Sequence, residues 1–231
     1  MNYNSIMENI IDNIEEGCTP SILLHSCCAP CSSHVIDVLS KHFDITILYY
    51  NPNIEPKEEY EKRKAEEIRF INEFPNKNKL DIMDCDHDND LFHETIKGLE
   101  NEKEGGARCI KCYYLRLDKT AKLAKEYNYD YFATTLTVSP LKNSQKLNEI
   151  GKYLSEKYDI KYLYSDFKKK EGYKHSIELS KEYNLYRQDY CGCIYSKEQR
   201  EQEKRTNQWS EPHIVHKKKR DLGFIPRSFW F

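Results

Sequence analysis

The chain has 231 residues, a formal net charge of −2, nine cysteines and a marked excess of tyrosine, with 18. This length fits one large domain, or one domain with appendages. The charge excludes wholesale nucleic-acid binding by net charge alone, although local basic patches remain available. Residues 1–17 are polar and acidic, without a basic start or a long apolar run. We therefore expect no secretory signal, no membrane span and a cytoplasmic location.

The hydrophobic pattern predicts helices and strands that alternate along the chain. Helical spacing covers residues 3–16, 32–42, 56–74 (with Tyr60, Ala65, Ile68 and Ile71 as the buried set), 91–99, 109–124, 143–154 and 175–183. Short apolar or β-branched runs predict strands at 21–25, 44–50, 80–83, 129–138 and 160–164. The alternation predicts an α/β fold with a doubly wound, mostly parallel sheet of the Rossmann-like, nucleotide-alpha-hydrolase-like kind, and a helical C-terminal part.

We divide the chain into a single α/β domain at 1–205, which includes the helical C-terminal part, and a tail at 206–231. From residue 197 to the end there are nine Lys and Arg against five Asp and Glu, and the last three residues are Phe-Trp-Phe. Basic residues with terminal aromatics suit an acidic partner such as RNA. A solvated extension or an expression-related tail explains the same composition equally well.

Seven of the nine cysteines occur in three tight clusters, which are Cys27, Cys28 and Cys31, then Cys109 and Cys112, and finally Cys191 and Cys193. A disulfide scaffold would require an oxidising compartment, which nothing in the sequence suggests. In a cytosolic protein such clusters more often bind metal or carry redox chemistry. The first cluster joins the end of a predicted strand to a predicted helix, where helix amides favour thiolates and anions.

The second cluster opens a predicted helix, and one helical turn separates its two sulfurs, so both can reach one metal ion or cluster. A Cys-x-x-Cys pair by itself also suits half of a zinc site or a thioredoxin-type redox pair. Ligation by sulfur without histidine suits an iron–sulfur cluster, for which Cys27, Cys28, Cys109 and Cys112 supply four thiolates.

The third cluster has a different chemistry. A disulfide across Cys191-Gly192-Cys193 closes a very short ring, and the strain makes it easily reduced. The glycine supplies the backbone freedom that this closure needs. We favour a two-electron relay over a pair of metal ligands. For Asp84-Cys85-Asp86-His87-Asp88, a solvated loop with a half-buried cysteine is favoured over a metal site.

Residues 25–31, His-Ser-Cys-Cys-Ala-Pro-Cys, stand where α/β enzymes that activate tRNA bases with ATP carry a glycine loop for pyrophosphate. Cysteines replace the glycines, and Pro30 removes an amide donor. We therefore do not expect ATP use.

The chain resembles the QueH-type epoxyqueuosine reductases, the cobalamin-independent enzymes that complete queuosine at the wobble position of tRNA anticodons. The resemblance spans about residues 20 to 200, and its motifs occur in order at 25–31, 50–54 (Tyr-Asn-Pro-Asn-Ile), 108–113 (Arg-Cys-Ile-Lys-Cys-Tyr), 134–136, 166–169 and 186–193. It implies a [4Fe-4S] cluster on Cys27, Cys28, Cys109 and Cys112, and a catalytic redox pair at Cys191 and Cys193.

The resemblance further implies a mononuclear iron near the cluster, for which Cys31 and a nearby Asp are candidate ligands. It also implies epoxyqueuosine-containing tRNA as the substrate and an electron donor that it does not identify. Lys168 to Lys170 and the tail are candidate phosphate contacts. Two rival functions are an ATP-dependent tRNA sulfur transferase on the same fold and a non-catalytic zinc-binding module.

Overall fold

A computed structural model of the chain describes residues 1–210, with side chains to residue 206. Its centre is one sheet of five parallel strands in the order β3-β2-β1-β4-β5. The strands are β1 (Ser21–His25), β2 (Asp44–Leu48), β3 (Leu80–Met83), β4 (Tyr131–Thr134) and β5 (Lys161–Tyr162). The chain builds outward from β1 to β3 and then continues on the other side of β1 with β4. The predicted doubly wound parallel sheet is confirmed.

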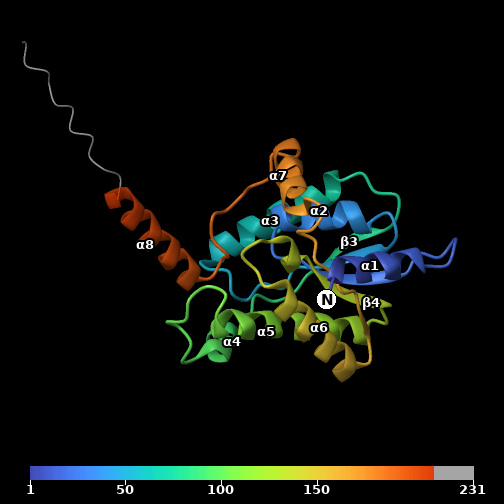
Figure 1. The fold of residues 1–231 in the computed structure, drawn as a ribbon, viewed down its shortest axis with the longest axis horizontal. Helices are drawn as coiled ribbons and strands as arrows, with labels where there is room; N and C mark the ends of the chain where they lie inside the picture. The colour runs from blue at the N-terminus through green and yellow to red at the C-terminus, as the bar shows by residue number, and fades with distance from the viewer. Residues whose placement is uncertain (211–231) are drawn as a thin grey trace, which may run out of the picture.

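Helices cover both faces of the sheet (Figure 1). In chain order they are α1 (Tyr3–Asp12), α2 (Ala29–Leu39), α3 (Lys57–Glu73), α4 (Asn89–Ile96), α5 (Ala107–Glu126), α6 (Ser144–Tyr158), α7 (Gly172–Glu182) and α8 (Ile194–Ser210). One face carries α2, α3 and α7, and the other carries α5 and α6, while α8 extends away from the body. None of the helices that the structure describes is long and apolar enough to cross a membrane.

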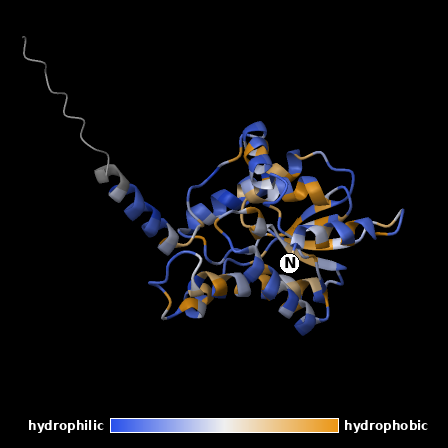
Figure 2. Ribbon diagram, viewed as in Figure 1, coloured by the Kyte–Doolittle hydropathy of each residue, from blue (hydrophilic) through white to orange (hydrophobic). Residues whose placement is uncertain are grey.

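Two apolar clusters hold the layers together, one on each face of the sheet. Ile22 and Leu24 of β1 belong to the cluster that contains α2, whereas Leu23 belongs to the cluster that contains α5 and α6. This split follows from the two-residue period of a strand. Figure 2 shows apolar residues gathered on the strands and on the helix faces turned to them, while α8 is mainly hydrophilic. A strand buried on both faces suits the near-continuous apolar runs of β1 and β2.

The structure corrects several predicted boundaries. The strand expected over 129–138 ends at Thr134, where the Thr134 hydroxyl accepts a hydrogen bond from the Leu136 amide and begins a 3-10 helix, η1 (Thr135–Val138). The helix expected from residue 32 begins at Ala29, with Pro30 in its first turn. Pro30 fits there because the first amides of a helix have no partner within the helix.

The prediction for the buried face of α3 was partly wrong. Tyr60 and Ile71 are buried as expected, but Ala65 and Ile68 are exposed. Their place is taken by two charged residues, Arg63 and Glu67, with 2% and 0% of their surface exposed. Apolar spacing missed them because this face of α3 turns toward the polar carboxyl edge of the sheet. At the C-terminal end, α8 continues to Ser210, past the boundary predicted at 205, and 211–231 lie outside the described residues.

Candidate metal and redox site

The first cysteine cluster lies where β1 ends and α2 begins. Cys28 is the N-cap of α2, and the sulfurs of Cys27, Cys28 and Cys31 all lie within 4.8 Å of one another. The Sγ atoms of Cys27 and Cys28 are 3.8 Å apart. Cys27 is 8% exposed and Cys28 4%. Among the described residues, this triad is the group that can hold a metal ion. It lies at the edge of the sheet, and at the switch point, where parallel α/β folds bind ligands.

The three thiols share their protons unequally. Hydrogen bonds from Cys28 and Cys31 hold the pKa of Cys27 well below its usual range, assisted by the charges of Lys142 and Arg116. Those same bonds to Cys27 raise the pKa of Cys28 to about 12 and that of Cys31 well above its ordinary value. Cys27 is therefore the thiol of the triad that loses its proton most readily. Because thiolates are the metal ligands, a cation that binds the triad must displace the protons that its sulfurs still carry.

The second cluster is in the first turns of α5. Cys109 packs in the same apolar cluster as Cys27 and Cys28, and its sulfur accepts a hydrogen bond from the Gly105 amide at 3.2 Å. Cys112 packs instead with Cys193, Phe92 and Ile96. Burial raises the pKa of Cys109, and it raises that of Cys112 to about 12. The ligand set Cys27, Cys28, Cys109 and Cys112 stays a prediction.

The third cluster lies in the turn between α7 and α8, and both of its cysteines are free thiols. Gly192 has a φ of +128°, in the region that favours glycine. A Cβ at this position would lie 2.9 Å from Cγ1 of Ile54. The Gly192 carbonyl accepts a hydrogen bond of 2.9 Å from the Glu55 amide. Burial raises the pKa of Cys193 to about 11. The segment is thus docked on the loop that follows β2.

Buried cations surround these sulfurs. Arg116 is 1% exposed, its Nε donates to Nε2 of His25 at 3.1 Å, and its Nη2 donates to Oδ1 of Asn51 at 2.5 Å. Its Nη1 lies 4.0 Å from the Cys112 sulfur. Lys142 is 9% exposed. Burial lowers its pKa, but the negative charges around it, those of Cys191 and Cys27 first, outweigh burial and raise the pKa well above its usual range. Cations of this kind stabilise an anionic group built from thiolates.

His25 is the histidine of the first motif, and it is a neutral structural residue. Burial, with the charge of Arg116, lowers its pKa to about 3. Its Nε2 faces both Nε of Arg116, which can only donate, and the Tyr50 carbonyl, which can only accept, each at 3.1 Å. Its Nδ1 lies 3.0 Å from the Thr134 hydroxyl. This pairing ties the ends of β1 and β4 together beside the triad.

Sequence reasoning missed Arg63, Glu67 and Lys142 as parts of the site. The signal that could have found the first two is the spacing of Tyr60, Arg63, Glu67 and Phe70, in which charged residues occupy positions of a buried helical face. Lys142 follows η1 in a polar stretch, and nothing in its sequence surroundings marks it as buried.

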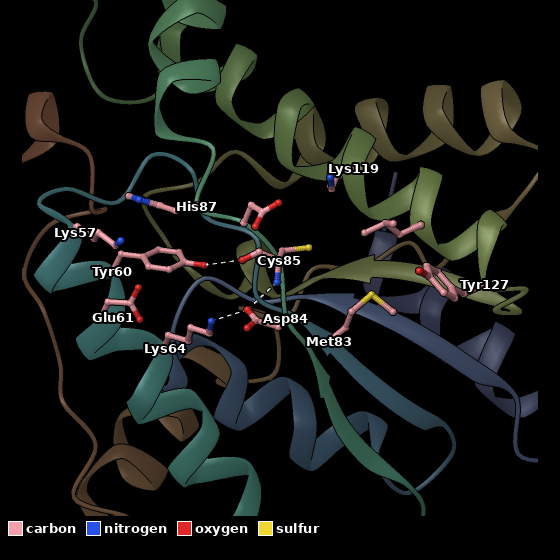
Figure 3. A pocket seen from close by; sticks show the side chains of 12 residues that line it. Lys57, Tyr60, Glu61, Lys64, Met83, Asp84, Cys85, His87, Lys119 and Tyr127 are labelled. Atoms are coloured by element: carbon pink, nitrogen blue, oxygen red, sulfur yellow. Dashed lines mark hydrogen bonds and ion pairs between the residues drawn. The ribbon is translucent and has the colours of Figure 1, made fainter.

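The loop after β3 forms a separate feature at the same edge of the sheet. Its residues 84–88 are exposed or half-buried, and Cys85 is half-buried. Asp84 to His87 line a cavity of about 660 Å³ between α3, this loop and α5. Figure 3 shows the Tyr60 hydroxyl donating to the Cys85 carbonyl, at 3.3 Å, and Lys64 paired with Asp84, at 2.5 Å. The volume is that of a typical small-ligand pocket.

A family model described as "Epoxyqueuosine reductase QueH" matches residues 22–199, a range that contains all seven clustered cysteines. The chain belongs to the epoxyqueuosine reductase QueH family. Epoxyqueuosine reductase QueH of Staphylococcus epidermidis is 44% identical over 201 residues, which cover 85% of this chain and 84% of the relative. That of Streptococcus pyogenes is 45% identical, over 85% of this chain and 78% of the relative. The predicted resemblance is confirmed.

A solved structure with a related fold is the U34-tRNA thiolase NcsA from Methanococcus maripaludis with its [4Fe-4S] cluster. The match has a TM-score of 0.50 at 13% sequence identity, and it covers 83% of this chain and 67% of the other. At this identity the likeness concerns the fold, and it agrees with the predicted fold class.

Proposed function

We propose that this chain reduces epoxyqueuosine to queuosine at the wobble position of tRNA anticodons, the final step of queuosine synthesis. The observation that carries the proposal is the Cys27/Cys28/Cys31 triad at the carboxyl edge of the sheet, with Cys27 and Cys28 buried and Cys31 half-buried, in a chain of the QueH family. The same family membership supports tRNA as the substrate, and we propose a cytoplasmic location for this activity.

Cys191 and Cys193 are proposed as the catalytic pair because their chemistry balances the reaction. Conversion of an epoxide to an alkene takes up two electrons and two protons and releases the oxygen as water. A dithiol that becomes a disulfide releases two electrons and two protons, so one Cys191/Cys193 couple matches one turnover. A thiol or a low-potential electron donor must then restore the dithiol. The raised pKa of Cys193 keeps a proton on its sulfur until the transfer.

We infer a [4Fe-4S] cluster held by Cys27, Cys28, Cys109 and Cys112. The donor set fits such a group, since all four thiols are buried and the cations of Arg116 and Lys142 lie beside them. When bound, an iron–sulfur cluster supplies single electrons at low potential. Cys31 remains as a fifth sulfur, within 4.8 Å of Cys27 and Cys28. We propose it, with a nearby Asp, as a ligand of a further iron.

The candidate phosphate contacts at Lys168 to Lys170 differ in their availability. Lys168 pairs with Asp166 at 2.9 Å, and Lys170 pairs with Glu8. Lys169 is exposed and takes part in neither of these two ion pairs. We therefore favour Lys169 among the three as a contact for tRNA phosphates.

Anaerobic turnover of epoxyqueuosine-containing tRNA, followed by mass spectrometry of the nucleosides, tests the function. With a low-potential reductant the wild type is expected to form queuosine, whereas Cys191→Ser and Cys193→Ser lose turnover when electrons come from a disulfide reductant. Cys18→Ser, an exposed cysteine outside the clusters, is the matched control and keeps full activity. Sulfur incorporation that consumes ATP would instead identify the rival transferase.

Iron and acid-labile sulfide analysis of anaerobically purified protein tests the cofactor separately. Iron and sulfide are expected together, with iron in modest excess because the further iron adds to the [4Fe-4S] cluster, and both should fall together in Cys28→Ser and Cys112→Ser. Zinc without sulfide would contradict the cluster and support the zinc-binding module.

A further inference from the structure

Arg63 is a buried charged residue that the chemistry described so far does not use. It lies on α3 with 2% of its surface exposed. Its Nε donates to Oε1 of Glu59 at 2.7 Å, and its Nη1 donates to the carbonyl of Cys191 at 3.2 Å. Its Nη2 is buried and has no hydrogen-bond partner among the described residues. Burying a guanidinium carries a large desolvation penalty, so its position requires a compensating interaction.

Arg63 anchors one cysteine site, and the loop after β2 connects that site to the other. Arg63 holds the Cys191 carbonyl, and its guanidinium carbon lies 5.0 Å from the centre of the Tyr190 ring. The loop after β2 binds the Gly192 carbonyl through the Glu55 amide, and in the same loop Nδ2 of Asn51 donates to the carbonyl of Ser26, the residue before Cys27, at 2.8 Å. The Cys191-Gly192-Cys193 segment is therefore fixed both to α3 and, through this loop, to the start of the triad.

The segment is fitted closely around this side chain. A Cβ at Gly192 would lie 3.2 Å from Nη1 of Arg63 and 3.5 Å from Nδ2 of Asn53. The Gly192 carbonyl is held at the same time by the amide of Glu55. The backbone on both sides of the Cys191–Gly192 peptide is thus anchored to α3 and to the loop after β2.

We propose that Arg63 is a positioning residue for the reduction: it holds the Cys191-Gly192-Cys193 segment in register with the Cys27/Cys28/Cys31 triad, so that the dithiol can deliver its electrons to the substrate. This inference rests on the proposed function. The planar fork of arginine donates to Glu59 and to the Cys191 carbonyl in fixed directions, which a lysine ammonium reproduces only in part.

The test compares Arg63→Lys, Arg63→Gln and Gly192→Ala in the full-length, iron-loaded protein. Misplacement of a reacting group by about 1 Å lowers rates by about 100-fold. We expect kcat to fall by about 10- to 100-fold in Arg63→Gln. The KM for tRNA should stay unchanged, and Arg63→Lys should recover part of kcat. Arg69→Gln on the same helix removes an arginine that pairs with Glu66 and Glu73, and it is the matched control, with kcat unchanged.

A readout without tRNA separates this inference from the proposed function. Alkylation of each cysteine, measured by peptide mass spectrometry, should accelerate at Cys191 and Cys193 in Arg63→Gln and stay at wild-type rates elsewhere. If the alkylation rate rises at every cysteine in Arg63→Gln, Arg63 only stabilises the fold as a whole and the inference is wrong. Gly192→Ala perturbs the same contact while Arg63 remains, so the two substitutions should be non-additive in kcat. Additive effects would overturn the proposal. A wild type that forms no Cys191–Cys193 disulfide on oxidation would instead contradict the redox pair itself.

Discussion

Glu67→Gln provides a direct test of the buried polar face of α3. Glu67 is fully buried, and neither of its carboxyl oxygens meets the geometry of a hydrogen bond among the described residues. Burial raises its pKa to about 8 from the ordinary value of 4.5, while the nearby hydroxyls of Ser32 and Ser26 oppose the rise. The folded protein therefore holds a proton on Glu67 at pH 7.

The size of the effect follows from proton linkage. Because the pKa is raised in the folded state, the contribution of Glu67 to stability is fully present below pH 4.5 and is lost as the pH rises toward 8. Between pH 5 and pH 7 this loss amounts to about 2–3 kcal/mol in the free energy of unfolding. The amide of glutamine has nearly the same shape and does not titrate, so the variant lacks this loss.

The assay is urea unfolding of metal-free, reduced protein at pH 5, 6 and 7. The stability of Glu67→Gln relative to the wild type should increase over this interval by about 2–3 kcal/mol. Glu66→Gln is the control, because the Arg69 pair lowers the pKa of Glu66 and gives no such increase. A wild type and a Glu67→Gln variant that change in parallel with pH would refute the buried neutral carboxyl.

Three further substitutions test other contacts. Arg116→Met leaves His25 and Asn51 without their buried donor, so the free energy of unfolding should fall by about 3–5 kcal/mol and the urea midpoint should fall with it. A midpoint within error of the wild type would show that these hydrogen bonds do not stabilise the fold. Gly151→Ala places a Cβ 2.3 Å from the Tyr162 ring, and this overpacking should lower the free energy of unfolding by about 1–3 kcal/mol. An unchanged melting temperature would contradict the close approach of Gly151 to Tyr162. Thr134→Ala removes the cap of η1 and should lower the free energy of unfolding by about 1 kcal/mol, whereas Thr134→Ser should retain most of the stability. Equal losses of stability in both variants would rule out the hydroxyl as the cause.

The fold was largely predictable because local patterns determine it. The apolar run of β2 and the helical spacing of apolar residues in α5 mark the residues that are buried when the parallel sheet forms. Both elements occur where the sequence predicts them. The strand over 129–138 was predicted too long because Thr135 to Val138 have the β-branched composition of a strand. The hydrogen bond that the Leu136 amide donates to the Thr134 hydroxyl overrides that preference, and amino-acid composition does not reveal such a bond.

The cysteines of the candidate site could be identified from the sequence, but most of their surroundings could not. Adjacent cysteines after a buried strand, with a third one helical turn on, indicate a sulfur site by their spacing alone. Arg63 and Lys142 come from parts of the chain remote from that motif, and each is a member of the site only because the chain folds back on itself.

The sequence by itself determined the parallel α/β class, the three cysteine clusters and, through their order and flanking residues, the family. These properties depend on residues close together along the chain. Only the tertiary structure decided that Cys27 is the thiol of the triad whose pKa is lowered, that Cys112 packs with Cys193, and that Arg63 anchors the Cys191-Gly192-Cys193 segment. Those properties depend on burial and on distances between groups far apart in sequence, because desolvation and Coulomb interactions act through space.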